Sequence, residues 1–402
     1  MQQIVRLLLV LKSRKRRKPM NPYYEVEWYD KETNTRVFIV IDQLMGGLAA
    51  GGIRMSPTVT MEDIRTLAHL MTKKNSVMGI PLGGAKVGIV GDPGGADKEE
   101  KLRAFGRMAE SLLKTKLLIG EDMGISSQNV KSIYESISFN PIELVVQIRQ
   151  QQGLQIQMPE GKNIDDLLSE TFMDYLAGFG LMEAMEEAAH LINLDLEQAQ
   201  VGLQGFGTVG SGIAMLLLEK GSTITAVSDA HRCMYRQTGF SLPELQVLKE
   251  HGGIIQPELF KNVKIVPSSE IVALPIDIFI PASISHAIHK DNADKITASL
   301  IVEAANFPTT SEAEQILLEK RKVILPDFVV NAGSATGFGL LITGQADYQG
   351  IFQATAQRIR GTVKTILTES LKGEKTPREV ANELASYNLK EMETSERKVE
   401  TK

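Results

Sequence analysis

A glycine-rich turn places the strongest constraint on how this chain folds. The segment Gln204-Gly-Phe-Gly-Thr-Val-Gly210 lies between a short apolar run and a helix-length apolar pattern. Gly205 permits a tight turn, Gly207 lets the backbone approach a pyrophosphate, and Gly210 lets the helix pack closely on the strand. The N-terminus of such a helix offers free N–H groups to phosphate oxygens. The spacing therefore predicts a Rossmann-type unit that contacts a dinucleotide through Gly205, Phe206, Gly207, Thr208, Val209 and Gly210.

An acidic residue follows at the distance that such a unit needs. The next predicted strand, Thr223–Val227, ends just before Asp229, which lies 24 residues beyond Gly205. A carboxylate there binds the adenosine ribose of NAD and repels the 2′-phosphate of NADP. His231 and Arg232 follow directly and could bind that phosphate. We therefore expect NAD and keep NADP open.

The rest of the chain alternates predicted strands and helices, which is typical of an α/β fold. A length of 402 residues predicts two or three domains. The strands expected in the first part are Val37–Ile41, Val87–Val90 and Leu117–Ile119, and its helices begin at a capping box, Thr60–Asp63, and at Lys98. The second part has strands at Ala199–Leu203, Thr223–Val227, Asp277–Ile280, Leu300–Glu303 and Lys322–Leu325, and helices at about Ser169–Leu191, Val209–Lys220, Gly350–Leu371 and Pro377–Ala385.

Two stretches lack such patterns. Residues of about Asn140–Asp166 are rich in glutamine and lose their periodicity after Val146, so we interpret them as a connection between domains. Lys390–Lys402 is interpreted as a charged, frayed tail.

Charge and cysteine content limit the classes of partner. Residues 1–19 hold seven basic residues and no acid, whereas the remaining 383 residues carry a net charge of −12, which gives no support for nucleic-acid binding. The apolar run Ile4–Leu11 is too short to span a bilayer, and its charges follow it, unlike those of a secretory signal. We interpret residues 1–19 as a dispensable basic tail or an extension upstream of Met20, with a transit peptide as the alternative.

A single cysteine, Cys233, excludes an internal disulfide framework and a cysteine metal cluster. It fits a reducing compartment best. We therefore expect a cytoplasmic protein with no metal site and no membrane partner.

Three glycine-rich segments of the first part carry charged side chains suited to catalysis: Gly51–Pro57, Lys74–Ile89 and Gly120–Gly124. One lysine ammonium can hold a substrate carboxylate. A second lysine, desolvated near the first, has its pKa lowered and can work as a base. Asp122 can then move a proton at a neighbouring nitrogen.

In these motifs the chain resembles the glutamate/leucine/phenylalanine/valine dehydrogenase family. The resemblance covers about half of the residues, from about Gly51 to Gly124 and from about Val201 to Gly333, and includes Glu303-Ala-Ala-Asn306 and Pro326-Asp-Phe-Val-Val-Asn-Ala-Gly333. It implies reversible oxidative deamination of an L-α-amino acid to a 2-oxo acid and ammonia. It also implies an N-terminal α/β substrate and oligomerisation domain, a Rossmann-type domain, an active site in the cleft between them, and a homo-oligomer formed by the first domain.

The resemblance also assigns roles to individual residues. Lys74 should bind the substrate α-carboxylate, Lys86 should activate the attacking water, and Asp122 should carry the proton to and from the amine. The cofactor side should include Ala282, Asn306 and Asn331. The implied domains are residues 20–140 with about 335–390, a linker at 141–166, and the NAD(P)-binding domain at 167–334.

Departures from the family bear on specificity. Glutamate-specific members have a lysine just before the Gly51-Gly52 pair of the substrate site, where this chain has Ala50, and a serine where it has Phe338. Removing a charge partner of the distal carboxylate costs on the order of 2–5 kcal/mol. The resemblance therefore favours an apolar, leucine-like substrate.

Two alternatives stay open. A diverged glutamate dehydrogenase could read the distal carboxylate with Arg54 or Lys73. A nucleotide-binding paralogue with little catalysis is suggested by Ala177 and Thr208, which replace the family's usual threonine and asparagine on the cofactor side.

Overall fold

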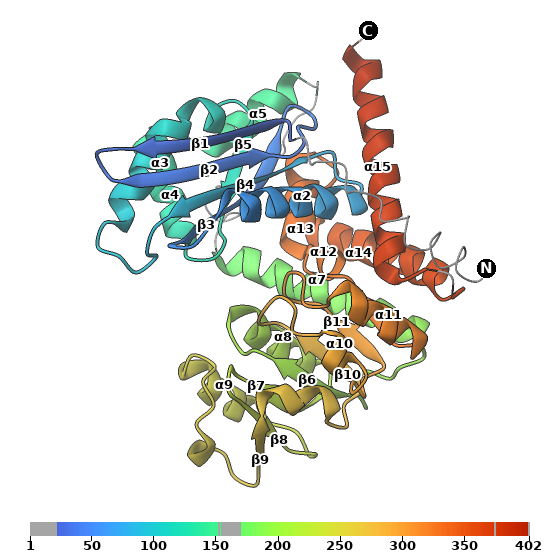
Figure 1. Ribbon diagram of the computed structural model, residues 1–402. Coiled ribbons are helices and arrows are strands. Elements are labelled where there is room, and N and C mark those ends of the chain that lie inside the picture. Colours follow the sequence, from blue (N-terminus) through green and yellow to red (C-terminus); the bar gives the residue numbers. More distant parts are fainter. Residues whose placement is uncertain (1–21, 152, 154–169, 374, 401–402) are drawn as a thin grey trace, which may run out of the picture.

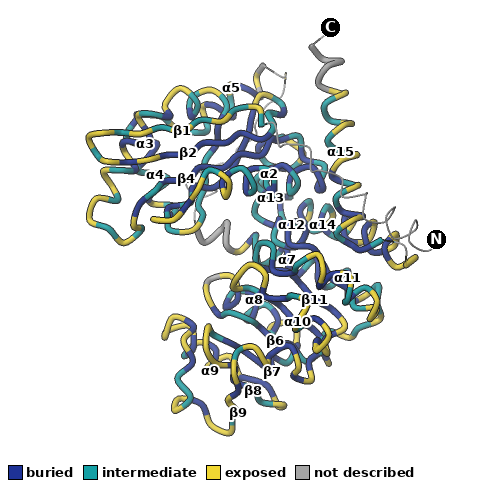
Figure 2. The backbone as a smooth tube through the Cα atoms, in the orientation of Figure 1, coloured by how far each residue is buried: buried dark blue, intermediate teal, exposed yellow. Residues whose placement is uncertain are grey.

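The computed structural model describes residues 22–151, 153, 170–373 and 375–400. Figure 1 shows two α/β parts, an N-terminal sheet with its helices and a second sheet below it, with helices of the C-terminal region between and beside them. Buried backbone is concentrated in the two sheets and in the helices that face them (Figure 2). Among the described residues, none of the helices has both the length and the apolar character that crossing a bilayer requires.

The first part is built on a mixed five-stranded sheet in the order β1-β2-β4-β3-β5. β1 and β2 are antiparallel to their neighbours, whereas β3 runs parallel to both β4 and β5. The strands are β1 Tyr24–Asp30, β2 Thr35–Ile41, β3 Ala49–Ser56, β4 Gly83–Val90 and β5 Leu117–Gly120. The strands predicted at residues 37–41, 87–90 and 117–119 are therefore confirmed.

Alternating side chains bury both faces of this sheet. On β2, Val37, Ile39 and Ile41 pack in the cluster that includes helices α3 (Lys98–Leu113) and α4 (Ser127–Ser136). Phe38 and Val40 pack on the opposite face, against helix α2 (Met61–Val77). The predicted capping box is present, because Thr60 Oγ1 accepts a hydrogen bond from the Asp63 N–H, and the Asp63 carboxylate accepts one from the Thr60 N–H.

The second part has a seven-stranded sheet in the order β12-β11-β10-β6-β7-β8-β9, parallel from β12 to β7. An antiparallel pair, β8 and β9, completes one edge. The strands are β6 Gln200–Gln204, β7 Thr223–Ser228, β8 Arg232–Tyr235, β9 Lys264–Pro267, β10 Ile278–Pro281, β11 Leu300–Val302 and β12 Val323–Leu325. The helices are α8 Thr208–Glu219, α9 Leu242–Glu250, α10 Lys290–Ala293 and α11 Ser311–Glu319, with short 3-10 turns at Pro257–Leu259 and Ser268–Ala273. This arrangement confirms the Rossmann-type prediction.

In the part of the chain that the structure describes, the helices that lie between and beside the two parts are α7 Glu170–Leu191, α12 Asp327–Val330, α13 Gly333–Ile342, α14 Ile351–Ser370 and α15 Pro377–Glu400. α7 and α13 pack so closely that a Cβ on Gly180 would lie 2.5 Å from Cα of Gly333. α15 also contacts the first part, since Asn388 Nδ2 donates to the carbonyl of Ser76 at 2.9 Å. The C-terminal helices therefore touch both parts of the molecule.

Two local predictions are corrected. The proposed connection begins as helix α5 (Pro141–Gln151), which buries Leu144, Val145 and Ile148, although residues 152 and 154–169 lie outside the described residues. The predicted frayed tail instead continues α15 as far as Glu400. The Gly51–Pro57 segment, which was not among the predicted strands, lies in strand β3 over most of its length. Residues 1–19 also lie outside the described residues.

Candidate active site

Lys86 and Asp122 form the centre of the candidate site. Lys86 lies within β4 and is 6% exposed, and its Nζ is 2.9 Å from Oδ2 of Asp122, which follows β5. The residues two positions before and after Lys86, which share its face of β4, are Gly84 and Gly88, and this face is turned toward α2. A Cβ at either glycine would lie under 3 Å from an atom of α2. The glycines on either side of Lys86 thus allow α2 to approach the strand.

A second cation shares the Asp122 carboxylate. Arg54 on β3 donates from Nε to the same Oδ2 at 3.0 Å. Burial would raise the pKa of Asp122, but Lys86 and Arg54 outweigh it and lower that pKa to about 2. Asp122 is therefore a carboxylate at neutral pH.

Lys74 lies in the last turn of α2 and belongs to the same group of charges. Burial lowers the pKa of Lys74 to about 8; the carboxylates of Asp327 and Asp122 raise this pKa, and the Lys86 charge lowers it further. The lysine of lowered pKa is thus the one that the resemblance assigns to the substrate carboxylate. A bound carboxylate would add a further charge that favours its ammonium form.

The paired glycines of the substrate motif are required by close backbone contacts. A Cβ on Gly51 would lie 1.7 Å from the carbonyl oxygen of Ala85, and one on Gly52 would lie 2.4 Å from that of Glu121. The pair therefore lets β3 pass between β4 and the segment that carries Asp122.

Ala50 and Phe338 both border apolar surroundings. Ala50 is 8% exposed and belongs to a cluster with Leu48, Leu67 and Leu70. Phe338 lies on α13 and packs, partly buried, against the same cluster.

Asn306 and Asn331 lie together at the end of the second part that faces these charges. Asn331 Nδ2 donates to Asn306 Oδ1 at 3.1 Å, and Asn331 Oδ1 is buried without a hydrogen-bond partner among the described residues. Asp327, at the start of α12, accepts from the Phe307 N–H at 2.8 Å. The carboxylate of Asp327 also raises the pKa of Lys74, which belongs to the first part. The two parts of the molecule therefore contribute to one site.

The glycine loop fits a dinucleotide phosphate. Gly205 has a φ of +95°, and a Cβ on Gly210 would lie 2.2 Å from the Gly205 carbonyl oxygen. Gly207, by contrast, faces open space at the start of α8, since a Cβ there would have no atom within 4 Å. Ala282 lies beside the loop and donates from its N–H to the Gln204 carbonyl. Phe206 is buried, Val209 is 48% exposed, and Thr208 is the first residue of α8.

Asp229 follows β7 beside this loop, but its carboxylate already holds the turn. Oδ1 accepts from the N–H groups of His231 and Arg232 at 2.8 and 2.7 Å, and Oδ2 accepts from that of Ile255 at 2.9 Å. Burial would raise the pKa of Asp229, and these N–H groups lower it. Two carboxylate oxygens offer about four acceptor sites, so one remains for a ribose hydroxyl.

Two contributors to the site were not identified in these roles from the sequence. Arg54 was considered only as a reader of a distal carboxylate, whereas its Nε is bound to Asp122. Asp327 was recognised only as part of a motif; the available signal was its position just after the predicted strand that ends at Leu325. Within the described residues, no group of three or more His, Cys, Asp or Glu side chains could hold a metal ion.

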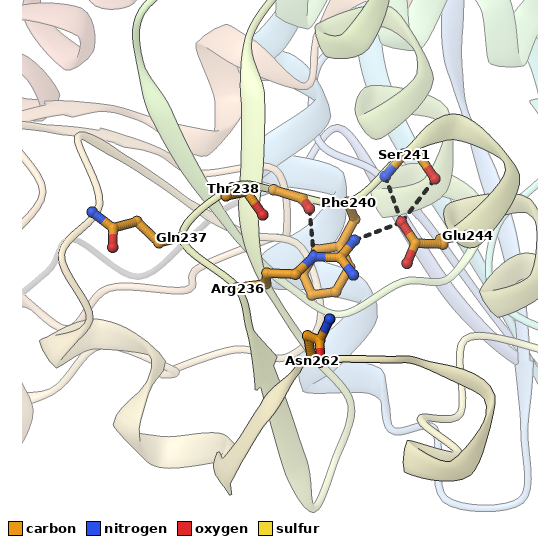
Figure 3. A pocket seen from close by; sticks show the side chains of 8 residues that line it. Arg236, Gln237, Thr238, Phe240, Ser241, Glu244 and Asn262 are labelled. Atoms are coloured by element: carbon orange, nitrogen blue, oxygen red, sulfur yellow. Dashed lines mark hydrogen bonds and ion pairs between the residues drawn. The ribbon is translucent and has the colours of Figure 1, made fainter.

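A pocket of about 650 Å³ lies away from these residues, at the Thr223 end of β7 (Figure 3). Its arginine, Arg236, pairs with Glu244 at 2.6 Å and donates to the Gly239 and Lys261 carbonyls. The guanidinium of Arg236 is therefore already bound by groups of the protein itself.

Two family models match the chain. The one described as Glutamate/Leucine/Phenylalanine/Valine dehydrogenase matches residues 173–395, and the one described as the Glu/Leu/Phe/Val dehydrogenase dimerisation domain matches residues 24–139. A glutamate dehydrogenase of Thermotoga maritima is 31% identical over 299 residues, which is 72% of this chain and 68% of that protein. An NAD-specific glutamate dehydrogenase of Clostridioides difficile is 31% identical over 296 residues, with the same shares covered.

Solved structures share the fold. A hetero-hexameric glutamate dehydrogenase of Thermus thermophilus, in a leucine-bound form, aligns with a TM-score of 0.75 and 24% identity, over 92% of this chain and 89% of that one. An L-tryptophan dehydrogenase of Nostoc punctiforme aligns with a TM-score of 0.64 and 21% identity, over 93% of this chain and 97% of that one.

Proposed function

The chain belongs to the glutamate/leucine/phenylalanine/valine dehydrogenase family, and from this membership we propose that it oxidatively deaminates an apolar L-α-amino acid with NAD. As a member of the family it is an oxidoreductase that acts on the CH–NH2 group of its donor. The products are a 2-oxo acid and ammonia, and the reaction is reversible.

The observation that carries the apolar preference is the surroundings of Ala50. An amino acid with a second carboxylate needs a cation there, but this position is Ala50, which is buried within an apolar core cluster against which Phe338 also packs. A carboxylate that is buried without a partner costs several kcal/mol. This supports an apolar side chain in that position.

Glutamate is the second candidate, and the names of the relatives favour it, since the proteins at 30–31% identity are called glutamate dehydrogenases. Of the two cations considered for the distal carboxylate, Arg54 binds Asp122, and Lys73 Nζ lies 5.8 Å from the centre of the Phe328 ring. Lys73 is therefore the group on which a glutamate activity would depend.

The charges of Lys74, Lys86 and Asp122 support a distinct catalytic role for each residue. Lys74 holds the substrate α-carboxylate, which places the amine near Asp122. Lys86 acts on the water that attacks the carbon–nitrogen double bond. The Lys86 charge is the largest of the effects that lower the pKa of Asp122, so loss of a proton from Lys86 makes Asp122 more basic. The two groups can thus pass a proton as a unit.

The cofactor site is proposed from the same features that fit a phosphate. The N-terminus of α8 and the Gly205–Gly210 loop would hold the pyrophosphate, and the remaining acceptor site of Asp229 would bind the ribose, which favours NAD over NADP. When bound, the dinucleotide accepts the hydride from the substrate α-carbon. Asn306 and Asn331 would border the nicotinamide.

Assembly and domain limits also stay proposals. We propose a homo-oligomer formed by the part matched by the dimerisation-domain model. The domains proposed are residues 20–140 with about 335–390, and 167–334.

The test is reductive amination by the purified chain with ammonia and NADH, then with NADPH. The panel contains 4-methyl-2-oxopentanoate, phenylpyruvate and 2-oxoglutarate. We expect turnover of an apolar oxo acid with NADH, and loss of it in Lys86→Ala. A preference for 2-oxoglutarate selects the second candidate. No turnover by folded protein that still binds NADH would instead indicate a non-catalytic paralogue.

A further inference from the structure

Strand register brings a third charge to the Lys86–Asp122 pair. On β3, Arg54 lies opposite Gly88 of β4, and Lys86 is two residues before Gly88, so Arg54 and Lys86 are diagonal neighbours on one face. On the other side, β3 pairs with β5 at Gly52 and Gly120. The same register, continued by two residues, places Arg54 opposite Asp122.

The two oxygens of Asp122 differ in their surroundings. Oδ2 lies 2.9 Å from Lys86 Nζ and accepts from Arg54 Nε at 3.0 Å. No hydrogen bond between residues that the structure describes ends on Oδ1. The carboxylate side chain is 21% exposed, so it is accessible from the site.

We propose that Arg54 is a positioning residue, which fixes Oδ2 of Asp122 so that Oδ1 is the atom that faces the substrate amine. The inference rests on the proposed function, because it needs Asp122 to exchange a proton with that amine. In the deamination direction the substrate ammonium N–H bond breaks, its electron pair stays on nitrogen, and the proton bonds to Oδ1. Lys86 alone would leave the carboxylate free to rotate about its Cβ–Cγ bond.

The charges around Asp122 agree with this role. Arg54 on β3 and Lys86 on β4 both lower the pKa of Asp122, whereas its burial raises it, and Lys74 on α2 is the third cation of the group. The guanidinium of Arg54 is a permanent charge, so it favours the carboxylate form of Asp122.

The experiment compares Arg54→Met and Arg54→Lys with a matched control, Arg65→Met. Arg65 lies in the same part of the molecule and pairs with Glu25 and Glu62, away from the site. The pH profile of kcat/KM is measured in the deamination direction, with the L-amino acid that corresponds to the 2-oxo acid the unaltered chain converts best. We expect Arg54→Met to lower kcat on the order of ten- to a hundredfold and to move the acid limb to higher pH. Arg54→Lys should restore the limb, and Arg65→Met should leave it unchanged.

A second readout does not depend on activity. A carbodiimide couples an amine to protonated carboxyl groups, and peptide mass spectrometry measures the reaction at Asp122 near pH 5. Asp122 should react several-fold faster in Arg54→Met than in the unaltered chain or in Arg65→Met. Folded Arg54→Met with an unchanged labelling rate and pH profile would overturn the proposal. Absence of turnover in the unaltered chain would count against the proposed function, and the labelling would still decide the role of Arg54.

Discussion

At Lys74, burial disfavours the ammonium charge on which the proposed binding of a substrate carboxylate depends. The pKa of Lys74 is lowered to about 8, so the ammonium form is present at neutral pH but is lost as the pH rises through that value. Lys86 and Asp122, by contrast, form a direct ion pair. The pKa values of Lys74 and Asp122 are thus both lowered within one small group of charges.

The first prediction concerns this titration. The inhibition constant of an unreactive carboxylate, such as 4-methylpentanoate, should increase as the pH rises from 7 to 9, because only the ammonium form attracts the carboxylate. Lys74→Met should bind the inhibitor weakly at every pH. An inhibition constant that stays the same across this range would contradict the assignment of Lys74.

The second prediction concerns the specificity position. Ala50→Lys combined with Phe338→Ser should raise the ratio of kcat/KM for 2-oxoglutarate to that for 4-methyl-2-oxopentanoate by about tenfold or more, since a cation then faces the second carboxylate. Phe338→Ser alone is the control for the altered volume. If the double variant keeps the ratio of the unaltered chain, Ala50 does not border the substrate side chain.

At the scale of elements, the Gly205–Gly210 loop and the start of α8 form the strand–turn–helix that we propose holds the dinucleotide phosphate. The sequence predicted this strand–turn–helix correctly, because its signal is local: three glycines at fixed spacing between two apolar patterns. The predicted helix start at Thr60 was likewise confirmed by its capping box.

The third prediction uses two glycines of α8. A Cβ on Gly210 would clash with the Gly205 carbonyl, whereas nothing lies within 4 Å of one on Gly212. Gly210→Ala should therefore weaken NADH binding by about tenfold or more. Gly212→Ala should leave it unchanged and stabilise the helix by up to ~1 kcal/mol. Fluorescence titration measures the affinity, and equal affinity of the two variants would refute the phosphate site.

Other elements depend on contacts that the sequence does not display. β3 contains two adjacent glycines, which normally indicate a loop, yet its position between β4 and β5 imposes a strand. The role of Arg54 depends on strand register and could not be read from spacing along the chain. In α5, glutamines interrupt the apolar pattern, and only tertiary packing shows that Leu144, Val145 and Ile148 are buried.

At the scale of the molecule, Arg378 joins the C-terminal helix to the second part. Its guanidinium pairs with three carboxylates from different elements, Glu303 after β11, Glu314 on α11 and Asp327 on α12. Glu303 and Asp327 are fully buried. α15 also contacts the end of α2, so one helix connects the first part of the molecule to the second.

The fourth prediction follows from this cluster. Burial raises the pKa of Glu303 to about 7, and the charge of Arg378 opposes that rise. A folded-state pKa above the unfolded value means that the stability present at low pH is lost as the pH rises through about 7. The Tm of Glu303→Gln relative to the unaltered chain should therefore increase between pH 5.5 and pH 8. Glu312→Gln, an exposed change on α11, is the control. If the Tm of all three chains changes with pH in the same way, Glu303 is not protonated.

The central claim is that this family member acts on an apolar amino acid. Its most direct test is the ratio of kcat/KM for 4-methyl-2-oxopentanoate to that for 2-oxoglutarate, with saturating ammonia and NADH. We predict a ratio of about thirty or more, which corresponds to the smaller cost of an unpaired distal carboxylate. A ratio below one would contradict the claim and show that another cation reads the second carboxylate.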